Sequence, residues 1–194
     1  MKKRVFLLIW LLIPTVLVNS AFALNFQQIK RGAERGDPTA EYNMGVVYAQ
    51  GLFGVKQDFV QAKWWYERAA ARGDALAQTN LGRLYETGRG VKQDYAQARS
   101  WYEKAAAQGH KTAQNQLGFM YEKGLGVKSD LAQARSWYEK AAAKGDAWAQ
   151  YNLGKMYAEG KGVAQDPAQA RAWYEKAAAQ GHTQAKEKLA DSKS

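Results

Sequence analysis

The chain has 194 residues, of which 46% are hydrophobic, which is enough for one domain of ordinary size with a buried core. It contains no cysteine, which excludes disulfides, thiol catalysis and cysteine-ligated zinc. The formal net charge is +10. A basic balance of this kind suits an acidic partner or an anionic membrane surface, and charge alone does not choose between them.

Residues 1–23 differ from the rest of the chain and predict a secretory signal peptide. Lys-Lys-Arg at 2–4 is a basic start, residues 5–18 are almost purely apolar, and Ala-Phe-Ala at 21–23 is a small-x-small cleavage site. The apolar run is shorter than the about 20 residues of a membrane-spanning helix. We therefore expect a periplasmic or secreted protein that starts near Leu24 and has no membrane span, with an uncleaved N-terminal anchor as the alternative. Without residues 2–4, 25 basic residues face 18 acidic ones, a net charge of +7.

The strongest pattern in the remaining chain is an internal repeat of 36 residues. A Trp-Tyr-Glu-Lys/Arg-Ala string recurs with this spacing, and so does a glycine eight residues after its tryptophan. A Gly-x-x-Tyr motif recurs with spacings of 37, 36 and 36. The three sets begin at Trp65, Trp101, Trp137 and Trp173; at Gly73, Gly109, Gly145 and Gly181; and at Gly45, Gly82, Gly118 and Gly154. Self-similarity at such a period is typical of solenoids built from stacked helix pairs.

Each repeat predicts two helices, for example over residues 75–87 and 95–108. Apolar positions step by four in the first helix and fall at i, i+3, i+4 and i+7 in the second, so each helix has one buried face. In each repeat an Asp precedes the second helix, and a Gln stands three residues after that Asp. This spacing predicts a capping box, in which the Asp accepts from a helix N–H and the Gln side chain reaches back to the Asp N–H. The pairs are Asp58 and Gln61, Asp94 and Gln97, Asp130 and Gln133, and Asp166 and Gln169.

These signals divide the chain into segments. Residues 24–36 predict a degenerate N-terminal capping helix. Residues 37–182 hold four repeats, at 37–73, 74–109, 110–145 and 146–181, and residues 183–194 are a half repeat and tail. Solenoids need such atypical ends to close their cores.

A glycine lies in the middle of every first helix, as Gly82 does in the second repeat. Glycine there costs about 1 kcal/mol relative to alanine. A cost that recurs in each repeat indicates a benefit that recurs too. We expect the first helix to approach the alanines of a neighbouring second helix closely.

The run from Ala98 to Asp130 follows A-x-x-W-Y-x-K-A-A-x-x-G-x-x-x-A-x-x-x-L-G-x-x-Y-x-x-G-x-G-V-x-x-D and resembles the Sel1-like repeat (SLR) family, relatives of the tetratricopeptide repeat. The resemblance covers roughly residues 33–190. It implies an all-α fold, a right-handed α-α superhelix (solenoid) with a concave inner face. Members of this family act as adaptors and scaffolds, and some exported bacterial ones resemble host-interaction factors or periplasmic immunity proteins against lipase toxins. A cysteine-rich branch is associated with binding or hydrolysis of penicillin-type compounds, which a chain without cysteine does not inherit.

Few residues predict chemistry. His110 and His182 lie two repeats apart, too far to share a metal, and each occupies a slot that Asp fills elsewhere. We interpret them as substitute caps or exposed turn residues. The repeated tryptophans predict core packing rather than stacking on bases, and so no nucleic acid. Four i, i+4 ion pairs are predicted on the second helices: Lys63–Glu67, Arg99–Glu103, Arg135–Glu139 and Arg171–Glu175.

We therefore predict a non-enzymatic monomer without cofactor or metal that binds a protein partner, as an adaptor or as an immunity protein for an envelope-acting toxin. A hydrolase of β-lactam or cell-wall-like substrates is the alternative. In related solenoids the first helix lines the groove, so first-helix positions that vary between repeats are informative. Aromatic side chains beside basic ones are common interface anchors. The predicted groove residues are Tyr42, Val46, Arg83, Phe119, Trp148, Tyr151 and Lys155. Packing against a neighbouring helix is the alternative role for Trp148.

Overall fold

The computed structural model describes residues 25–191, and within this range the chain is helical, without a strand. A helical segment at 25–34 comes first. It is followed by α2 (Pro38–Gln50), α3 (Phe59–Ala71), α4 (Ala75–Thr87), α5 (Tyr95–Ala107), α6 (Lys111–Lys123), α7 (Leu131–Ala143), α8 (Ala147–Glu159), α9 (Pro167–Ala179) and α10 (Thr183–Asp191). The predicted signal peptide at 1–23 lies outside the described residues. None of the helices in residues 25–191 is long and apolar enough to cross a bilayer.

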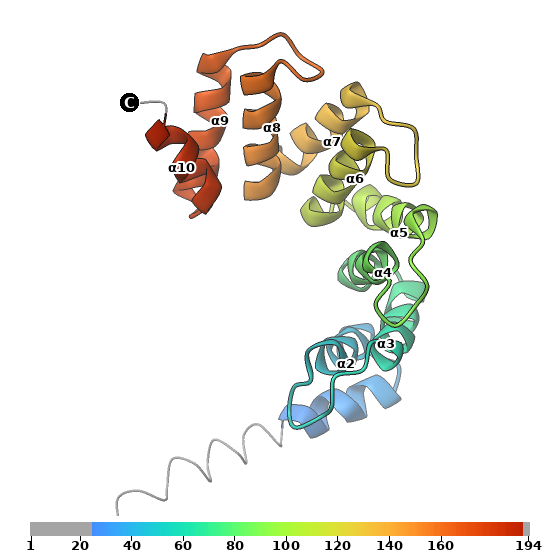
Figure 1. The fold of residues 1–194 in the computed structure, drawn as a ribbon. Helices are drawn as coiled ribbons and strands as arrows, with labels where there is room; N and C mark the ends of the chain where they lie inside the picture. Colours follow the sequence, from blue (N-terminus) through green and yellow to red (C-terminus); the bar gives the residue numbers. More distant parts are fainter. Residues whose placement is uncertain (1–24, 192–194) are drawn as a thin grey trace, which may run out of the picture.

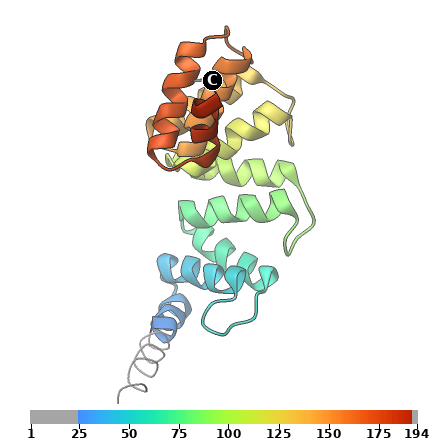
Figure 2. The same cartoon turned by 60° about the vertical axis from the view of Figure 1, so that its left-hand side comes forward.

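The helices form a curved stack, which confirms the predicted α-solenoid. The two helices of one repeat pack on each other, and the second packs on the first helix of the next repeat. Helices α2, α4 and α6 lie on the inner side of the curve (Figure 1), α8 lines one hollow together with α4 and α6, and the layers follow one another along the axis of the stack (Figure 2). We call α2, α4, α6 and α8 the inner helices, and α3, α5, α7 and α9 the outer helices, of repeats one to four.

The start of each outer helix is capped by one half of the predicted capping box. The Asp94 side chain accepts from the Gln97 N–H at 3.0 Å, as predicted. The other half of the prediction is wrong, because the Asp94 N–H donates to the Tyr85 carbonyl at 2.9 Å and leaves no role for the Gln side chain. The same bond joins Asp58 to Tyr48, Asp130 to Tyr121 and Asp166 to Tyr157. It ties the start of each outer helix to the end of its inner helix.

The mid-helix glycines make room for a buried tyrosine. Tyr102 is 0% exposed, and a Cβ placed on Gly82 would come within 2.5 Å of its ring. The predicted close approach of the helices is confirmed, but the group that fills it is this tyrosine and not the alanines. The same pairs recur as Gly45 with Tyr66, Gly118 with Tyr138 and Gly154 with Tyr174.

The repeated tryptophans seal the joints between repeats. Trp101 is half-buried and packs on the hydrophobic core that α3 and α4 form between the first two repeats, and Trp137 and Trp173 pack on the equivalent cores one and two repeats later. The Lys104 ammonium lies 3.9 Å from the centre of the Trp101 ring. Trp137 and Trp173 carry Lys140 and Lys176 at 4.1 and 3.8 Å, so each of these rings combines the predicted core packing with a cation–π contact.

All four i, i+4 ion pairs predicted on the outer helices are formed, with N–O distances of 2.7 to 3.4 Å. Their side chains are partly exposed, so each pair stabilises its helix by only about 0.2–0.5 kcal/mol. They therefore contribute little to the stability of the fold.

Candidate partner-binding groove

The inner face carries a hollow of about 660 Å³ that spans α4, α6 and α8, which we call the central hollow. Two large apolar side chains flank it, Leu76 on α4 and Trp148 on α8, and they are 45% and 57% exposed. Phe119 lines it from α6, Tyr42 lines it from α2, and Arg83 lines it from α4. The stacking of repeats thus brings residues far apart in sequence to one surface.

The polar floor of the central hollow is held by hydrogen bonds between repeats. Thr79 Oγ1 donates its single proton to the Ala75 carbonyl at 2.7 Å, so His110 Nδ1, 2.9 Å from the same oxygen, acts as donor. Burial lowers the pKa of His110, against the pull of Asp146 and Asp74. His110 makes no cap hydrogen bond to its own helix. The prediction of a substitute cap is therefore wrong for this residue.

His182 is a cap, as predicted, because the Ala185 N–H donates to its Nδ1 at 3.3 Å. It is 8% exposed and therefore not an exposed turn residue. Its ring stacks on Tyr151 at 4.6 Å and meets the Trp148 ring edge-on at 4.4 Å between centroids. Burial lowers the pKa of His182, so the ring stays neutral at physiological pH.

This stack changes the role of one predicted groove residue. Tyr151 is only 9% exposed, because His182 and Tyr174 cover its ring, so it does not line the central hollow. It supports Trp148 through His182 instead. Trp148 has both of the roles considered for it, packing and groove lining. Its ring packs on the ring of His182, while the residue is 57% exposed to solvent.

A second hollow of about 720 Å³ lies between α2 and α4, and we call it the first-repeat hollow. Three predicted groove residues line this hollow. Val46 lines this one alone, whereas Tyr42 and Arg83 also line the central hollow. The remaining lining residues are Ala49, Gln50, Gln57, Phe59, Tyr66, Asn80, Leu84, Thr87 and Arg89.

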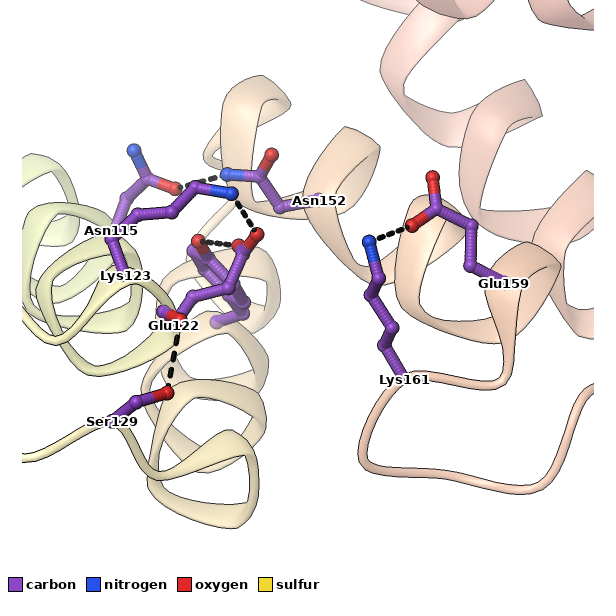
Figure 3. Close-up of polar contacts among 8 residues, drawn as sticks. Asn115, Glu122, Lys123, Ser129, Asn152, Glu159 and Lys161 are labelled. Atoms are coloured by element: carbon purple, nitrogen blue, oxygen red, sulfur yellow. Dashed lines mark hydrogen bonds and ion pairs between the residues drawn. The ribbon is translucent and has the colours of Figure 1, made fainter.

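Lys155 lies apart from both hollows, in a cluster of charges between α6 and α8. Its neighbours there include Glu122, Glu159 and Lys161. Glu122 pairs with Lys123 at 2.7 Å, and Glu159 pairs with Lys161 (Figure 3). The positive charge of Lys155 is therefore partly balanced by acidic groups within the chain.

Most of the lining residues were not predicted, and two of them are instructive, Leu76 and Arg89. Leu76 occupies the same repeat position as Trp148, so the prediction that Trp148 lines the groove could have been extended to Leu76. Arg89 lies in the loop after α4, between Gly88 and Gly90. Arg89 was not predicted because only first-helix positions were expected to line the groove.

Comparison with protein families matches the family described as Sel1 repeat at residues 38–74, 75–110, 111–146 and 149–182. No curated protein matches the chain. Among solved structures, a protective antigen present in uropathogenic Escherichia coli strains, displaying an SLR fold, is 43% identical with a TM-score of 0.79 over 84% of this chain and 35% of that one. A Sel1 repeat protein from Oxalobacter formigenes is 40% identical with a TM-score of 0.80 over 84% of this chain and 66% of that one.

An immunity protein from Pseudomonas aeruginosa is 24% identical with a TM-score of 0.59 over 82% of this chain and 59% of that one. At this identity the likeness shows the fold alone. The chain spans 35%, 66% and 59% of the lengths of these three proteins.

Proposed function

Because the chain belongs to the Sel1 repeat family, whose members are generally non-catalytic scaffolds, we propose that it is an exported module that binds a segment of a partner protein along its inner face. The observation that carries the proposal is the exposure of Leu76 and Trp148 on either side of the central hollow. Large exposed apolar side chains around a concave surface mark interaction sites, and tryptophan is a frequent anchor.

The contact residues in this proposal are Tyr42, Val46, Arg83, Phe119 and Trp148, which line the two hollows. Tyr151 fixes the direction of Trp148 through His182, and Lys155 adds charge beyond the rim. A rigid aromatic anchor loses little conformational entropy on binding, which favours affinity.

Export is supported by the signal-peptide layout of residues 1–23, and we place the protein in the periplasm or outside the cell. The Escherichia coli neighbour is a protective antigen, and the Pseudomonas aeruginosa neighbour with the same fold is an immunity protein. Both an adaptor and an immunity role require a stable complex with a protein and no turnover. We propose no catalytic role.

Capture from an envelope extract tests the function. The wild-type protein should retain a partner that the pair Leu76→Ala and Trp148→Ala releases, with unchanged helicity by circular dichroism. Charge reversal at Arg83 and Lys155 should weaken the same complex. The matched control removes two exposed apolar side chains from the outer face, with Val60→Ala and Trp64→Ala, and should bind as the wild type does. Full binding by both groove variants would contradict the proposal.

A further inference from the structure

One position near the end of each inner helix decides whether the buried tyrosine of that repeat faces a carboxylate of its own inner helix. The four residues at this position are Ala49, Glu86, Glu122 and Ala158. In the second repeat the Tyr102 hydroxyl donates to Glu86 Oε2 at 2.6 Å, and in the third the Tyr138 hydroxyl donates to Glu122 Oε2 at 2.8 Å. Figure 3 shows the surroundings of this second carboxylate. Repeats two and three therefore fill the same niche with a carboxylate of their own.

The niche is open in the first repeat. Ala49 takes the place of the glutamate, and both Ala49 and Tyr66 line the first-repeat hollow. Burial raises the pKa of Tyr66, moderated by Arg83 and by a hydrogen bond with Asn80, so the hydroxyl keeps its proton. A protonated phenol in this position is a donor, as its counterparts are in the next two repeats.

The charges around this niche favour an anion. Arg83 and Arg89 line the first-repeat hollow, and no Asp or Glu is among its lining residues. Arg83 donates to Asn80 at 2.9 Å and Arg89 lies over the Phe59 ring at 5.4 Å, so both guanidinium groups are oriented by the protein. Guanidinium groups bind carboxylates through paired, charge-assisted hydrogen bonds.

The fourth repeat lacks the glutamate too, but its hollow has a different balance of charge. The hollow beside Ala158 and Tyr174 is lined by Glu159 and Asp191 as well as by basic residues. Carboxylates of the chain are therefore already present there. The first repeat is the place where a missing glutamate coincides with an uncompensated pair of arginines.

We propose that the first-repeat hollow binds a side-chain carboxylate from an Asp or Glu of the partner protein, which takes the place that Glu86 and Glu122 fill in the next two repeats. The inference rests on the proposed function and names the chemistry of the segment that binds: an acidic stretch that runs along α2 and α4. The carboxylate accepts from the Tyr66 hydroxyl and lies between Arg83 and Arg89.

The test places the missing carboxylate into the chain itself. Ala49→Glu should close the niche as Glu86 does one repeat later, and Ala158→Glu is the matched control with the same change of charge in the fourth repeat. The probe is a hexaglutamate peptide blocked at both ends, titrated into the purified protein and followed by NMR. We expect shifts around Tyr66 and Arg83, binding weakened about tenfold or more by Ala49→Glu, as expected for a lost charge-assisted site, and about twofold or less by Ala158→Glu.

Tyr66→Phe keeps the ring against Gly45 and removes the hydroxyl, with its hydrogen bond to Asn80, so it should weaken binding of the peptide several-fold without a change in helicity. A blocked hexaglutamine peptide should not bind. Equal weakening by both Ala→Glu variants, or no weakening by Ala49→Glu, would overturn the proposal. The proposal would also be overturned if hexaglutamine with a free C-terminal carboxylate bound and the blocked hexaglutamate did not. The hollow would then recognise a chain terminus and not an acidic side chain.

The two proposals fail in different ways. Ala49→Glu leaves Leu76 and Trp148 untouched. If the partner is captured equally by wild type and Ala49→Glu but lost by the Leu76 and Trp148 variant, the carboxylate site is wrong and the binding groove stands.

Discussion

Lys144→Gln should stabilise the protein, because the third repeat lacks a hydrogen bond between its inner helix and the end of its outer helix that the second and fourth repeats have. Gln78 accepts from Gln108 Nε2 at 2.9 Å, and Gln150 accepts from Gln180 Nε2 at 2.7 Å. Each of these acceptors lies on an inner helix, and each donor lies just beyond the outer helix of the same repeat. In the third repeat the donor position holds Lys144.

The acceptor in the third repeat, Gln114, is left unsatisfied. Gln114 Nε2 donates to the Ala106 carbonyl at 3.2 Å, but its Oε1 is buried without a partner. A new neutral hydrogen bond contributes about 0.5–1.5 kcal/mol, and leaving a buried acceptor unpaired costs about 1–3 kcal/mol. We expect Lys144→Gln to raise the free energy of unfolding by about 1–2 kcal/mol, which corresponds to roughly 2–8 °C in melting temperature for a chain of this size.

The assay is urea unfolding followed by circular dichroism, with Gln108→Lys as the reciprocal control. That variant creates the same defect at Gln78 and should lose a similar amount. The result that would refute the reasoning is a Lys144→Gln protein no more stable than the wild type while Gln108→Lys is clearly destabilised, since Gln114 would then have a partner of its own.

Three further predictions concern the core and the titratable groups. Gly118→Leu should lower the free energy of unfolding by about 3 kcal/mol or more, since even a Cβ there would lie 2.5 Å from the Tyr138 ring; unchanged urea midpoints would remove the close-approach argument. Glu122→Ala should cost about 1–3 kcal/mol by leaving the Tyr138 hydroxyl without its acceptor. Burial opposes ionisation of Glu122, but hydrogen bonds from Lys123 and Tyr138 outweigh it and hold its pKa below 4.5. The stabilisation is therefore present above pH 4.5 and is lost as pH falls through the lower folded pKa. If the free energy of unfolding of the wild type and of Glu122→Ala changed in parallel with pH, this account would be wrong. Burial lowers the pKa of His110 and His182 below 6.5, so the unfolded chain binds more protons and stability should fall as pH drops from about 6.5 toward the folded values; replacing both with Asn should flatten the urea midpoint over this range.

The helix boundaries could be predicted because their causes are local and recur. The first helix of the second repeat was expected at 75–87 and is found at Ala75–Thr87, bounded by Asp74 and by Gly88 in the left-handed conformation. What the pattern could not show is which of two adjacent aromatics, Trp101 or Tyr102, enters the core. Both lie near one face of the helix, and the choice depends on the gap that Gly82 leaves on another helix.

The groove was predictable to the extent that it depends on single helices. Val46, Arg83 and Phe119 lie on the inner faces of their helices and line the hollows. Tyr151 occupies the same kind of position but is covered by His182, which lies beyond the outer helix of the fourth repeat. A contact between side chains 31 positions apart leaves no trace in the period of one helix, so its burial could not be foreseen.

Differences between repeats carry more information about function than the repeat itself. The four inner helices share a backbone arrangement, so a hollow that exists beside one and not the next must come from side chains. Ala49 in place of Glu86 removes a negative charge beside a hollow, whereas Lys144 in place of Gln108 leaves the buried Gln114 acceptor unpaired. A departure that leaves a cavity with unbalanced charge is therefore where binding energy is available to a partner, and a departure that leaves a buried group unpaired is where stability can be gained by restoring the repeat.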